Sequence, residues 1–192
     1  MDEATPIRST ISWGRIARRT RVPLGFLFAA FYLWRARPDW TSLAAGAIVA
    51  AAGVFLRAIA SGHVKKNEQL ATTGPYAYCR NPLYLGSIII AAGFAIASRD
   101  MWIALGIIAL FAVVYVPVIR SEETFLRQRF VEYDVYARRV PRLLPNTAWF
   151  PAFTSGFSRE LYLQHREYNA LIGAAAMLAA LVVKILWFPV PW

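Results

Sequence analysis

Long apolar runs alternate with short polar segments along this chain, and they predict membrane-spanning helices. The run from Met101 to Ile119 carries no charged side chain. It is about as long as a helix needs to be to cross a hydrocarbon core of roughly 30 Å. Further runs of the same kind are Val22–Trp34, Leu43–Leu56 with a continuation to Ala60, Leu83–Ser98 and Leu171–Trp187. The pattern therefore predicts an all-α integral membrane protein with about five transmembrane helices.

The third and fourth runs are separated by a single short polar segment, Ser98-Arg99-Asp100. So short a connection predicts a tight hairpin of two antiparallel helices. Because a hairpin returns the chain to the face from which it started, Arg80-Asn81-Pro82 before it and Glu122-Glu123 after it should lie on one side of the membrane. Two motifs far apart in the sequence are thus expected to be neighbours.

The segment Thr124–Arg139 is polar and charged, with apolar and aromatic residues recurring at helical spacing. It predicts one amphipathic helix that lies across the site or the membrane interface. Val140-Pro141 should end this helix. The last apolar run adds a C-terminal transmembrane helix at about 169–188. Since no repeat or low-complexity segment interrupts the chain, residues 1–192 are predicted to form a single domain, with a motif-bearing core at 61–145.

Composition and charge agree with a membrane location. The chain is 58% hydrophobic and 17% charged, whereas soluble domains carry about a quarter charged residues. Its net charge is +10, and 16 of the 21 Lys and Arg lie before the first run, between the second and third, or in Arg120–Arg166. The positive-inside rule then places the N-terminus and these loops in the cytoplasm and the C-terminus on the opposite side. Membrane lipids, rather than nucleic acid, are the expected partners of this basic surface.

Cys79 is the only cysteine in the sequence. A single cysteine excludes a disulfide framework and a Cys-based metal site, and no metal centre is predicted. The thiol is either a small filler beside Arg80 or an accessible group that contacts a ligand.

Several motifs are concentrated on the predicted cytoplasmic side. Residues 73–84 read T-G-P-Y-A-Y-C-R-N-P-L-Y, and Glu122-Glu123 follows the hairpin. Tyr133-x-x-Tyr136 and Val140-Pro-Arg-Leu-Leu-Pro145 come next. As a set, these motifs resemble the isoprenylcysteine carboxyl methyltransferase family and its bacterial and archaeal relatives. They are more distantly similar to the phospholipid N-methyltransferases. The resemblance covers roughly Ser61–Pro145.

The resemblance implies S-adenosylmethionine as cofactor, held in a cytoplasmic pocket, and a lipophilic small-molecule or lipidated acceptor that enters from the bilayer. It also implies a prokaryotic inner membrane as the location. The predicted function is transfer of a methyl group to that acceptor, most like carboxyl methylation of a prenylcysteine. An alternative is N-methylation of a phospholipid or small amine. The acceptor's identity and entry route, the oligomeric state and the role of the last helix stay open.

Matching to the family's motif, together with the charges of the cofactor, gives a predicted cofactor-binding set. Glu122 can neutralise the cofactor's ammonium, while His63, Lys66 or Arg80 can hold its carboxylate. The ring of Tyr76 offers a face for the cationic sulfonium. The complete set is His63, Lys66, Glu68, Gln69, Leu70, Ala71, Tyr76, Arg80, Asn81, Pro82, Leu83, Tyr84 and Glu122. At Asn81 many relatives have a histidine, so any role of an imidazole there is lost.

The predicted catalytic residues are Arg120, Glu122 and Glu123. A carboxylate that attacks a sulfonium needs a dry pocket and no base, and Arg120 is the nearest candidate for the family's carboxylate-positioning arginine. An amine acceptor would have to lose a proton, which Glu122, Glu123 or His63 can assist.

Two other classes remain as alternatives. Membrane sterol reductases resemble this family in their C-terminal halves and bind a nicotinamide cofactor. They carry an Asn-Tyr-Gly-Asp run where this chain has Leu83-Tyr84-Leu85-Gly86-Ser87. A non-enzymatic membrane scaffold would bind neither cofactor and would tolerate loss of Glu122.

Overall fold

The computed structural model describes residues 25–65, 68–145 and 156–188. These residues form helices joined by loops, with no strand among them. The elements are a helix over residues 25–35, α2 (Trp40–Ser61), the 3₁₀-helix η1 (Gly74–Ala77), α3 (Pro82–Ser98), α4 (Met101–Leu110), the π-helix η2 (Phe111–Tyr115), α5 (Val116–Arg129), α6 (Tyr133–Arg139), α7 (Arg159–Gln164) and α8 (Tyr168–Trp187). The prediction of an all-α protein is confirmed for the described residues.

Three helices are long and apolar enough to cross a membrane. They are α2, α8 and the uninterrupted helix Met101–Arg129 that α4, η2 and α5 form together. Helix α3 is equally apolar in character but shorter, at 17 residues. The predicted first span, Val22–Trp34, begins outside the described residues and continues as the helix over residues 25–35. Three spans are thus supported by length and composition, and the count of five stays a prediction.

The predicted hairpin between α3 and α4 is confirmed. Helix α3 ends at Ser98, and Arg99 adopts a left-handed conformation with φ of 51°. Asp100 then caps α4, because its carboxylate accepts hydrogen bonds from the backbone N–H groups of Trp102 at 2.9 Å and Ile103 at 3.1 Å. A left-handed residue that ends one helix, followed by an acidic N-cap that begins the next, reverses the chain within two residues.

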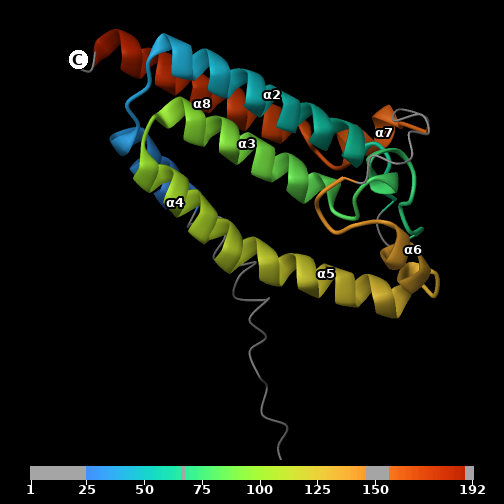
Figure 1. Cartoon of the computed structure of the whole chain (residues 1–192). Helices are drawn as coiled ribbons and strands as arrows, with labels where there is room; N and C mark the ends of the chain where they lie inside the picture. Colours follow the sequence, from blue (N-terminus) through green and yellow to red (C-terminus); the bar gives the residue numbers. More distant parts are fainter. Residues whose placement is uncertain (1–24, 66–67, 146–155, 189–192) are drawn as a thin grey trace, which may run out of the picture.

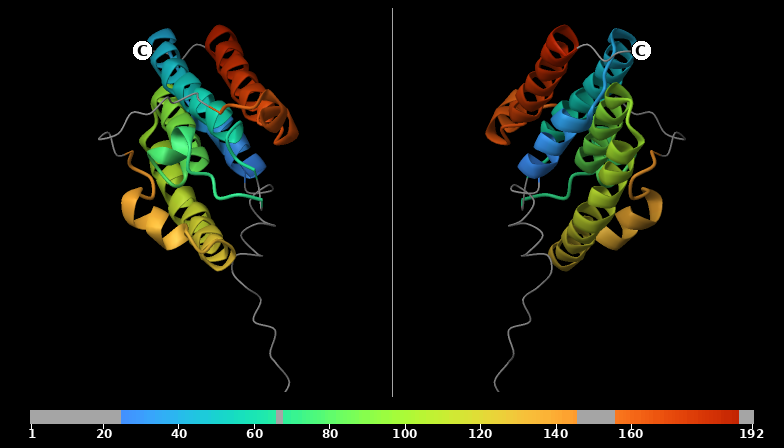
Figure 2. Two further views of the ribbon diagram at one scale, coloured as in Figure 1. Left: turned by 90° about the vertical axis from the view of Figure 1, so that its right-hand side faces the viewer. Right: turned by 90° about the vertical axis from the view of Figure 1, so that its left-hand side faces the viewer.

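Helix α2 packs against both α3 and α8, and lies between them in the views of Figure 2. Its contact with α3 is unusually close, since an added Cβ at Gly46 would lie 2.4 Å from the carbonyl oxygen of Gly93. One at Gly53 would lie 2.7 Å from the carbonyl oxygen of Gly86. Small residues on both helices let the backbones approach, which is how helices in membranes gain packing energy.

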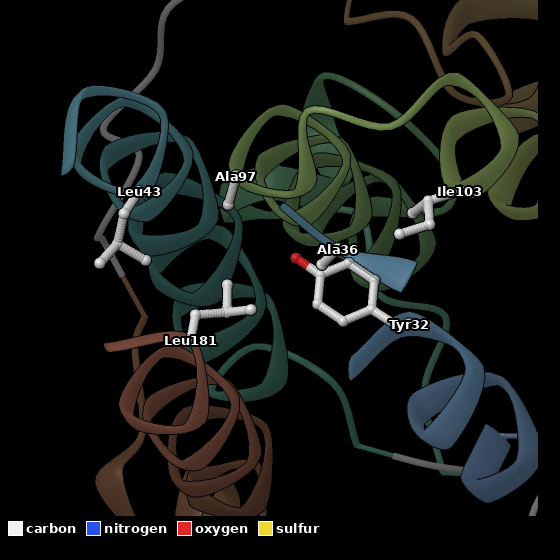
Figure 3. Packing of buried hydrophobic residues seen from close by; sticks show 6 residues of the cluster. All are labelled: Tyr32, Ala36, Leu43, Ala97, Ile103 and Leu181. Atoms are coloured by element: carbon white, nitrogen blue, oxygen red, sulfur yellow. The ribbon is translucent and has the colours of Figure 1, made fainter. Parts of the chain in front are cut away.

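A compact apolar cluster closes the hairpin end of the bundle (Figure 3). It joins the helix over residues 25–35 to α2, α3, α4 and α8 through Tyr32, Ala36, Leu43, Ala97, Ile103 and Leu181. The Tyr32 hydroxyl donates a hydrogen bond to the Phe94 carbonyl at 2.8 Å, which satisfies its polar group. The helices are therefore fixed together at this end, and the loops and short helices gather at the other (Figure 1).

The prediction of one amphipathic helix over Thr124–Arg139 is wrong. Helix α5 continues directly out of the apolar span, and the backbone at Phe130 is extended, with φ of −124° and ψ of 118°. The break lets α6 turn back toward the loop before α3. There Tyr133 is buried and the Tyr136 hydroxyl donates to the Tyr76 carbonyl at 2.7 Å. Contacts far apart in sequence override the helical periodicity.

The close approach of α2 and α3 gives a first prediction. Gly93→Leu should lower the free energy of unfolding of the detergent-purified protein by about 1–3 kcal/mol, and with it the melting temperature. The reason is that the leucine side chain would meet the backbone of Gly46 and Ala50. Gly173→Leu is the matched control, since nothing lies within 4 Å of the Cβ position there. Equal melting temperatures for the two variants would contradict this account of the packing.

Candidate active site

A cavity of about 840 Å³ lies at the end of the bundle opposite the hairpin turn. Its wall is formed by the helix over residues 25–35, α2, the loop that includes η1, α3, η2, α5, α6 and Glu167 before α8. This volume is in the range of small-molecule and cofactor sites. The cavity is thus large enough for a nucleoside-containing cofactor.

The buried carboxylate of Glu123 on α5 lies behind the cavity wall and contacts Arg80 and Asn81, which line the cavity. It accepts hydrogen bonds from Nη2 and Nε of Arg142 at 2.6 and 3.0 Å and from Nδ2 of Asn81 at 3.3 Å, and Nη1 of Arg80 lies 3.6 Å away. The backbone N–H of Arg80 also donates to the Pro141 carbonyl at 2.9 Å. We call this group of contacts the Glu123 clasp. It joins the segment before α3, helix α5 and the segment after α6.

Tyrosines of α6 and η1 form the next layer around the clasp. Nη1 of Arg80 donates to the Tyr133 hydroxyl at 3.3 Å, and burial raises the pKa of Tyr133. Burial also raises the pKa values of Tyr76 and Tyr136, and for Tyr76 the negative charges of nearby acidic groups, Glu122 among them, add to the effect. These phenols therefore stay protonated and act as neutral hydrogen-bonding groups.

The turn that presents Tyr76 depends on a glycine packed against a histidine. Gly74 has φ of +56°, and a Cβ there would lie 2.5 Å from the ring of His63. His63 is buried, with Nδ1 2.8 Å from the Ile59 carbonyl oxygen. Since Gly74 provides both the left-handed conformation and the space, His63 positions this turn from outside the cavity.

The structure brings most of the predicted cofactor-binding residues to one cavity. Those that line it are Gln69, Leu70, Ala71, Tyr76, Arg80, Asn81, Pro82, Leu83, Tyr84 and Glu122. His63 lies behind the Gly74 turn, and Glu68 is exposed and outside the lining. Lys66 lies outside the described residues.

The three predicted catalytic residues face different directions. Glu122 lines the cavity, Glu123 is buried in the clasp and Arg120 is exposed and does not line the cavity. All three are on α5, where successive side chains are separated by about 100° around the axis. The three side chains therefore cannot all face one cavity. Arg120 and Glu123 do not line it, and their catalytic roles stay predictions.

Cys79 has the environment of a filler residue. It is 2% exposed and does not line the cavity. Burial raises its pKa to about 11, so the thiol is protonated at neutral pH and a weak nucleophile.

The sequence interpretation missed an ion pair on the cavity wall. Nη2 of Arg57 on α2 lies 2.7 Å from Oε2 of Glu167, and Nε of Arg57 lies 3.0 Å from the same oxygen. Nη1 of Arg57 donates to the Leu83 carbonyl at 3.1 Å and to the Ser87 hydroxyl on α3. An arginine inside an apolar run is itself a signal of a partner, because unpaired charges in a membrane are costly. The sequence did not indicate that this partner is Glu167, because it lies 110 positions from Arg57.

Aromatic residues form another part of the wall. Tyr84 on α3 and Tyr115 in η2 make an edge-to-face contact with ring centroids 5.7 Å apart, and Tyr115 stacks on Phe111 at 4.2 Å. Pro117, two positions after Tyr115, lacks the N–H that a regular helix would use. A π-helical turn at such a point re-aims side chains and often occurs at functional sites; here it presents Tyr115 to the cavity.

Part of the chain is similar to known proteins. Residues 40–132, a little under half of the chain, match the family described as phospholipid methyltransferase. This match supports the broader class of integral-membrane methyltransferases for the segment that holds α2 to α5, while the isoprenylcysteine subfamily itself is not confirmed. No solved structure matches the chain.

Two curated relatives are similar over part of their length. The nickel-cobalt-cadmium resistance protein NccN of Alcaligenes xylosoxydans xylosoxydans is 38% identical over 101 residues, which are 53% of this chain and 45% of the relative. The cobalt-zinc-cadmium resistance protein CzcN of Cupriavidus metallidurans is 35% identical over 86 residues, which are 45% of this chain and 40% of the relative. The chain thus matches less than half the length of either relative.

The clasp leads to a second prediction. Glu123→Gln should destabilise the protein by about 1–3 kcal/mol, because it leaves Arg80 and Arg142 without their carboxylate; the exposure of Arg142 keeps the loss below that of a fully buried pair. Glu122→Gln, one position earlier on the same helix, should change stability by less than about 0.5 kcal/mol. Thermal unfolding in detergent measures both. A larger loss for Glu122→Gln would exclude the clasp as the stabilising contact.

Proposed function

We propose that this protein is an integral-membrane methyltransferase that moves a methyl group from S-adenosylmethionine to a lipophilic acceptor. The observation that carries the proposal is one cavity with two kinds of wall. Tyr76, Arg80 and Glu122 provide polar and charged groups on the loop side. Phe26 and Ala29, from the helix over residues 25–35, provide an apolar surface on another side. A polar cofactor and an apolar acceptor thus have adjoining places.

The residues present fit the cofactor's charges. Glu122 lines the cavity as a carboxylate and can hold an ammonium. Among the described residues, Nε of Arg80 is the buried side-chain nitrogen without a hydrogen-bond partner. An unmade hydrogen bond of this kind is costly unless a ligand completes it, and a carboxylate is a suitable acceptor. The cofactor, when bound, supplies a methyl group on a cationic sulfonium.

The chain's main contribution to such a reaction is positioning. Methyl transfer needs alignment of the two reacting atoms more than it needs functional groups. The Glu123 clasp and the Tyr136–Tyr76 hydrogen bond fix the loop wall, and Tyr84 and Tyr115 fix the wall on the helix side. A lipophilic acceptor would reach the cavity from the bilayer past Phe26, with the loop side facing the cytoplasm of a prokaryotic inner membrane.

The acceptor's class is a separate part of the proposal. The sequence resemblance favours a carboxylate, as in a prenylated cysteine, while the family match is described as phospholipid methyltransferase. Arg120, the arginine expected to position an acceptor carboxylate, does not line the cavity. Arg57 and Arg80 do line it, so the proposal keeps both acceptor classes.

The names of the two curated relatives concern resistance to metal cations. We also propose that the methyl transfer contributes to resistance to metal cations. Within the described residues, no group of three or more His, Cys, Asp or Glu is placed to hold a metal ion.

Calorimetric titration with S-adenosylhomocysteine, with NADPH in parallel, tests the proposed function. We expect micromolar binding of S-adenosylhomocysteine and none of NADPH. Glu122→Gln should weaken this binding about tenfold or more, because a charge-assisted hydrogen bond to the ammonium is lost. Glu132→Gln, at an exposed position before α6, should bind like the wild type. Binding of NADPH alone would favour a reductase, and binding of neither would favour a scaffold; both refute the proposal.

A further inference from the structure

A second, smaller cavity adjoins the one described above. Its volume is about 370 Å³, at the small end of the range for ligand sites. It is lined by arginines from the segment before α3, from α5, from α6 and from the segment after α6, and by two further residues of α6: Arg80, Arg127, Arg138, Arg142, Asp134 and Ala137. Of these six described residues, Arg80 alone also lines the larger cavity. We call this second space the arginine cavity, and we propose that it binds the phosphate group of a phosphomonoester, a function separate from methyl transfer.

The charges around the arginine cavity do not balance. Four guanidinium groups line it, against one carboxylate among the described lining residues, that of Asp134. The Glu123 carboxylate, which contacts Arg80 and Arg142, adds a second negative charge. Four positive charges less two negative charges leave an excess of +2. A ligand with two negative charges is the one that this excess attracts most strongly.

Donor groups are available to such a ligand. Nε of Arg127 donates to Asp134 at 2.8 Å, and Nε and Nη2 of Arg142 donate to Glu123 at 3.0 and 2.6 Å. Within the described parts of the chain, Nη1 of Arg142, both Nη atoms of Arg127 and the side chain of Arg138 have no hydrogen-bond partner. All three arginines are exposed, so a ligand can reach these N–H groups from outside the protein.

The kind of donor favours phosphate over carboxylate. A guanidinium presents its N–H groups as a planar fork that pairs with two oxygens of a phosphate. Arg127, Arg138 and Arg142 belong to three different segments of the chain. Donors from three segments suit the three acceptor oxygens of a phosphomonoester better than the two of a carboxylate. A phosphomonoester also carries a charge of about −1.5 to −2 at pH 7, which matches the excess of the cavity.

The arginine cavity lies beyond the apolar part of the helix Met101–Arg129. Arg120 is the first charged residue of this helix, and Arg127 follows seven positions later. With a rise of about 1.5 Å per residue, Arg127 is roughly 10 Å further along the axis. That distance reaches the head-group layer and the water next to it. A lipid phosphomonoester and a soluble one therefore share the chemistry that this site recognises, and both can reach it.

The first test compares methyl phosphate with dimethyl phosphate by calorimetry on the detergent-purified protein at pH 7. The two probes differ by one methyl group, and the monoester carries more negative charge. The wild type should bind methyl phosphate at least tenfold more tightly than dimethyl phosphate. Equal affinity for the two probes, or no binding of methyl phosphate, would overturn the proposal.

A matched pair of variants on α6 locates the binding. Arg138→Gln removes a lining arginine, while Arg139→Gln removes the same charge one position later, outside the lining. Arg138→Gln should lose at least tenfold in affinity for methyl phosphate, and Arg139→Gln less than about twofold. Similar losses in both variants would show that binding follows the overall charge of the surface, and they would refute the site. Arg127→Gln, with Arg129→Gln as its control, repeats the comparison on α5 if Arg138→Gln does not fold.

Lipid nanodiscs distinguish the two sources of a phosphomonoester. The titration with methyl phosphate is repeated in phosphatidylcholine nanodiscs that contain equal amounts of either phosphatidic acid, a monoester, or phosphatidylglycerol, a diester. An affinity for methyl phosphate at least tenfold lower with phosphatidic acid than with phosphatidylglycerol supports a lipid head group, because that lipid then occupies the site. Equal affinities support a soluble phosphate compound.

S-adenosylhomocysteine separates this site from the proposed function. At a saturating concentration it should change the affinity for methyl phosphate by less than about threefold, because Arg80 is the described residue that the two cavities share. A loss of tenfold or more would assign the phosphate to the larger cavity and overturn the proposal. Binding of methyl phosphate without S-adenosylhomocysteine binding would refute the methyltransferase alone, and the reverse result would refute the phosphate site alone.

Discussion

The cavity of this protein depends on one buried carboxylate. Glu123 joins Arg80 and Asn81, which precede α3, to Arg142, which follows α6. Without this clasp, the segment before α3 would be held only by α3, and the segment after α6 only by α6. A charge buried this far is stable only when several donors surround it, so the requirement to satisfy Glu123 also fixes the loops. The motif residues are in place at the cavity because the clasp holds their backbone there.

The helix packing explains why the cavity lies at one end. Glycine contacts bring α2 and α3 together, and the apolar cluster around Ile103 and Leu181 closes the hairpin end. At the other end α5 continues past the apolar span to Arg129, and the loop with η1 lies between it and α3 (Figure 1). The space between these elements is lined by aromatic residues, such as Tyr84 and Tyr115, and by charged residues, such as Arg80 and Glu122. Such a cavity suits a reaction between a charged cofactor and a membrane-soluble molecule.

The sequence predicted those features that depend on local spacing. Three polar residues between two apolar runs predicted the hairpin, and the hairpin predicted that Asn81 and Glu123 would meet, as they do at 3.3 Å. The direction of single side chains on α5 was not predictable from a motif, so Glu123 was expected at the reaction centre and lies in the clasp. The break at Phe130 and the pairing of Arg57 with Glu167 were also missed. Both arise from contacts between distant segments, which periodicity does not encode.

Hydrogen–deuterium exchange in the presence of S-adenosylhomocysteine tests the central claim, that the cavity behind the clasp binds the methyl donor. The account predicts slower exchange of the backbone N–H groups in residues 69–84 and 122–136, where the loop wall lies, and unchanged exchange in residues 171–186 of α8. Protection confined to α8, or no protection at a saturating ligand concentration, would contradict it.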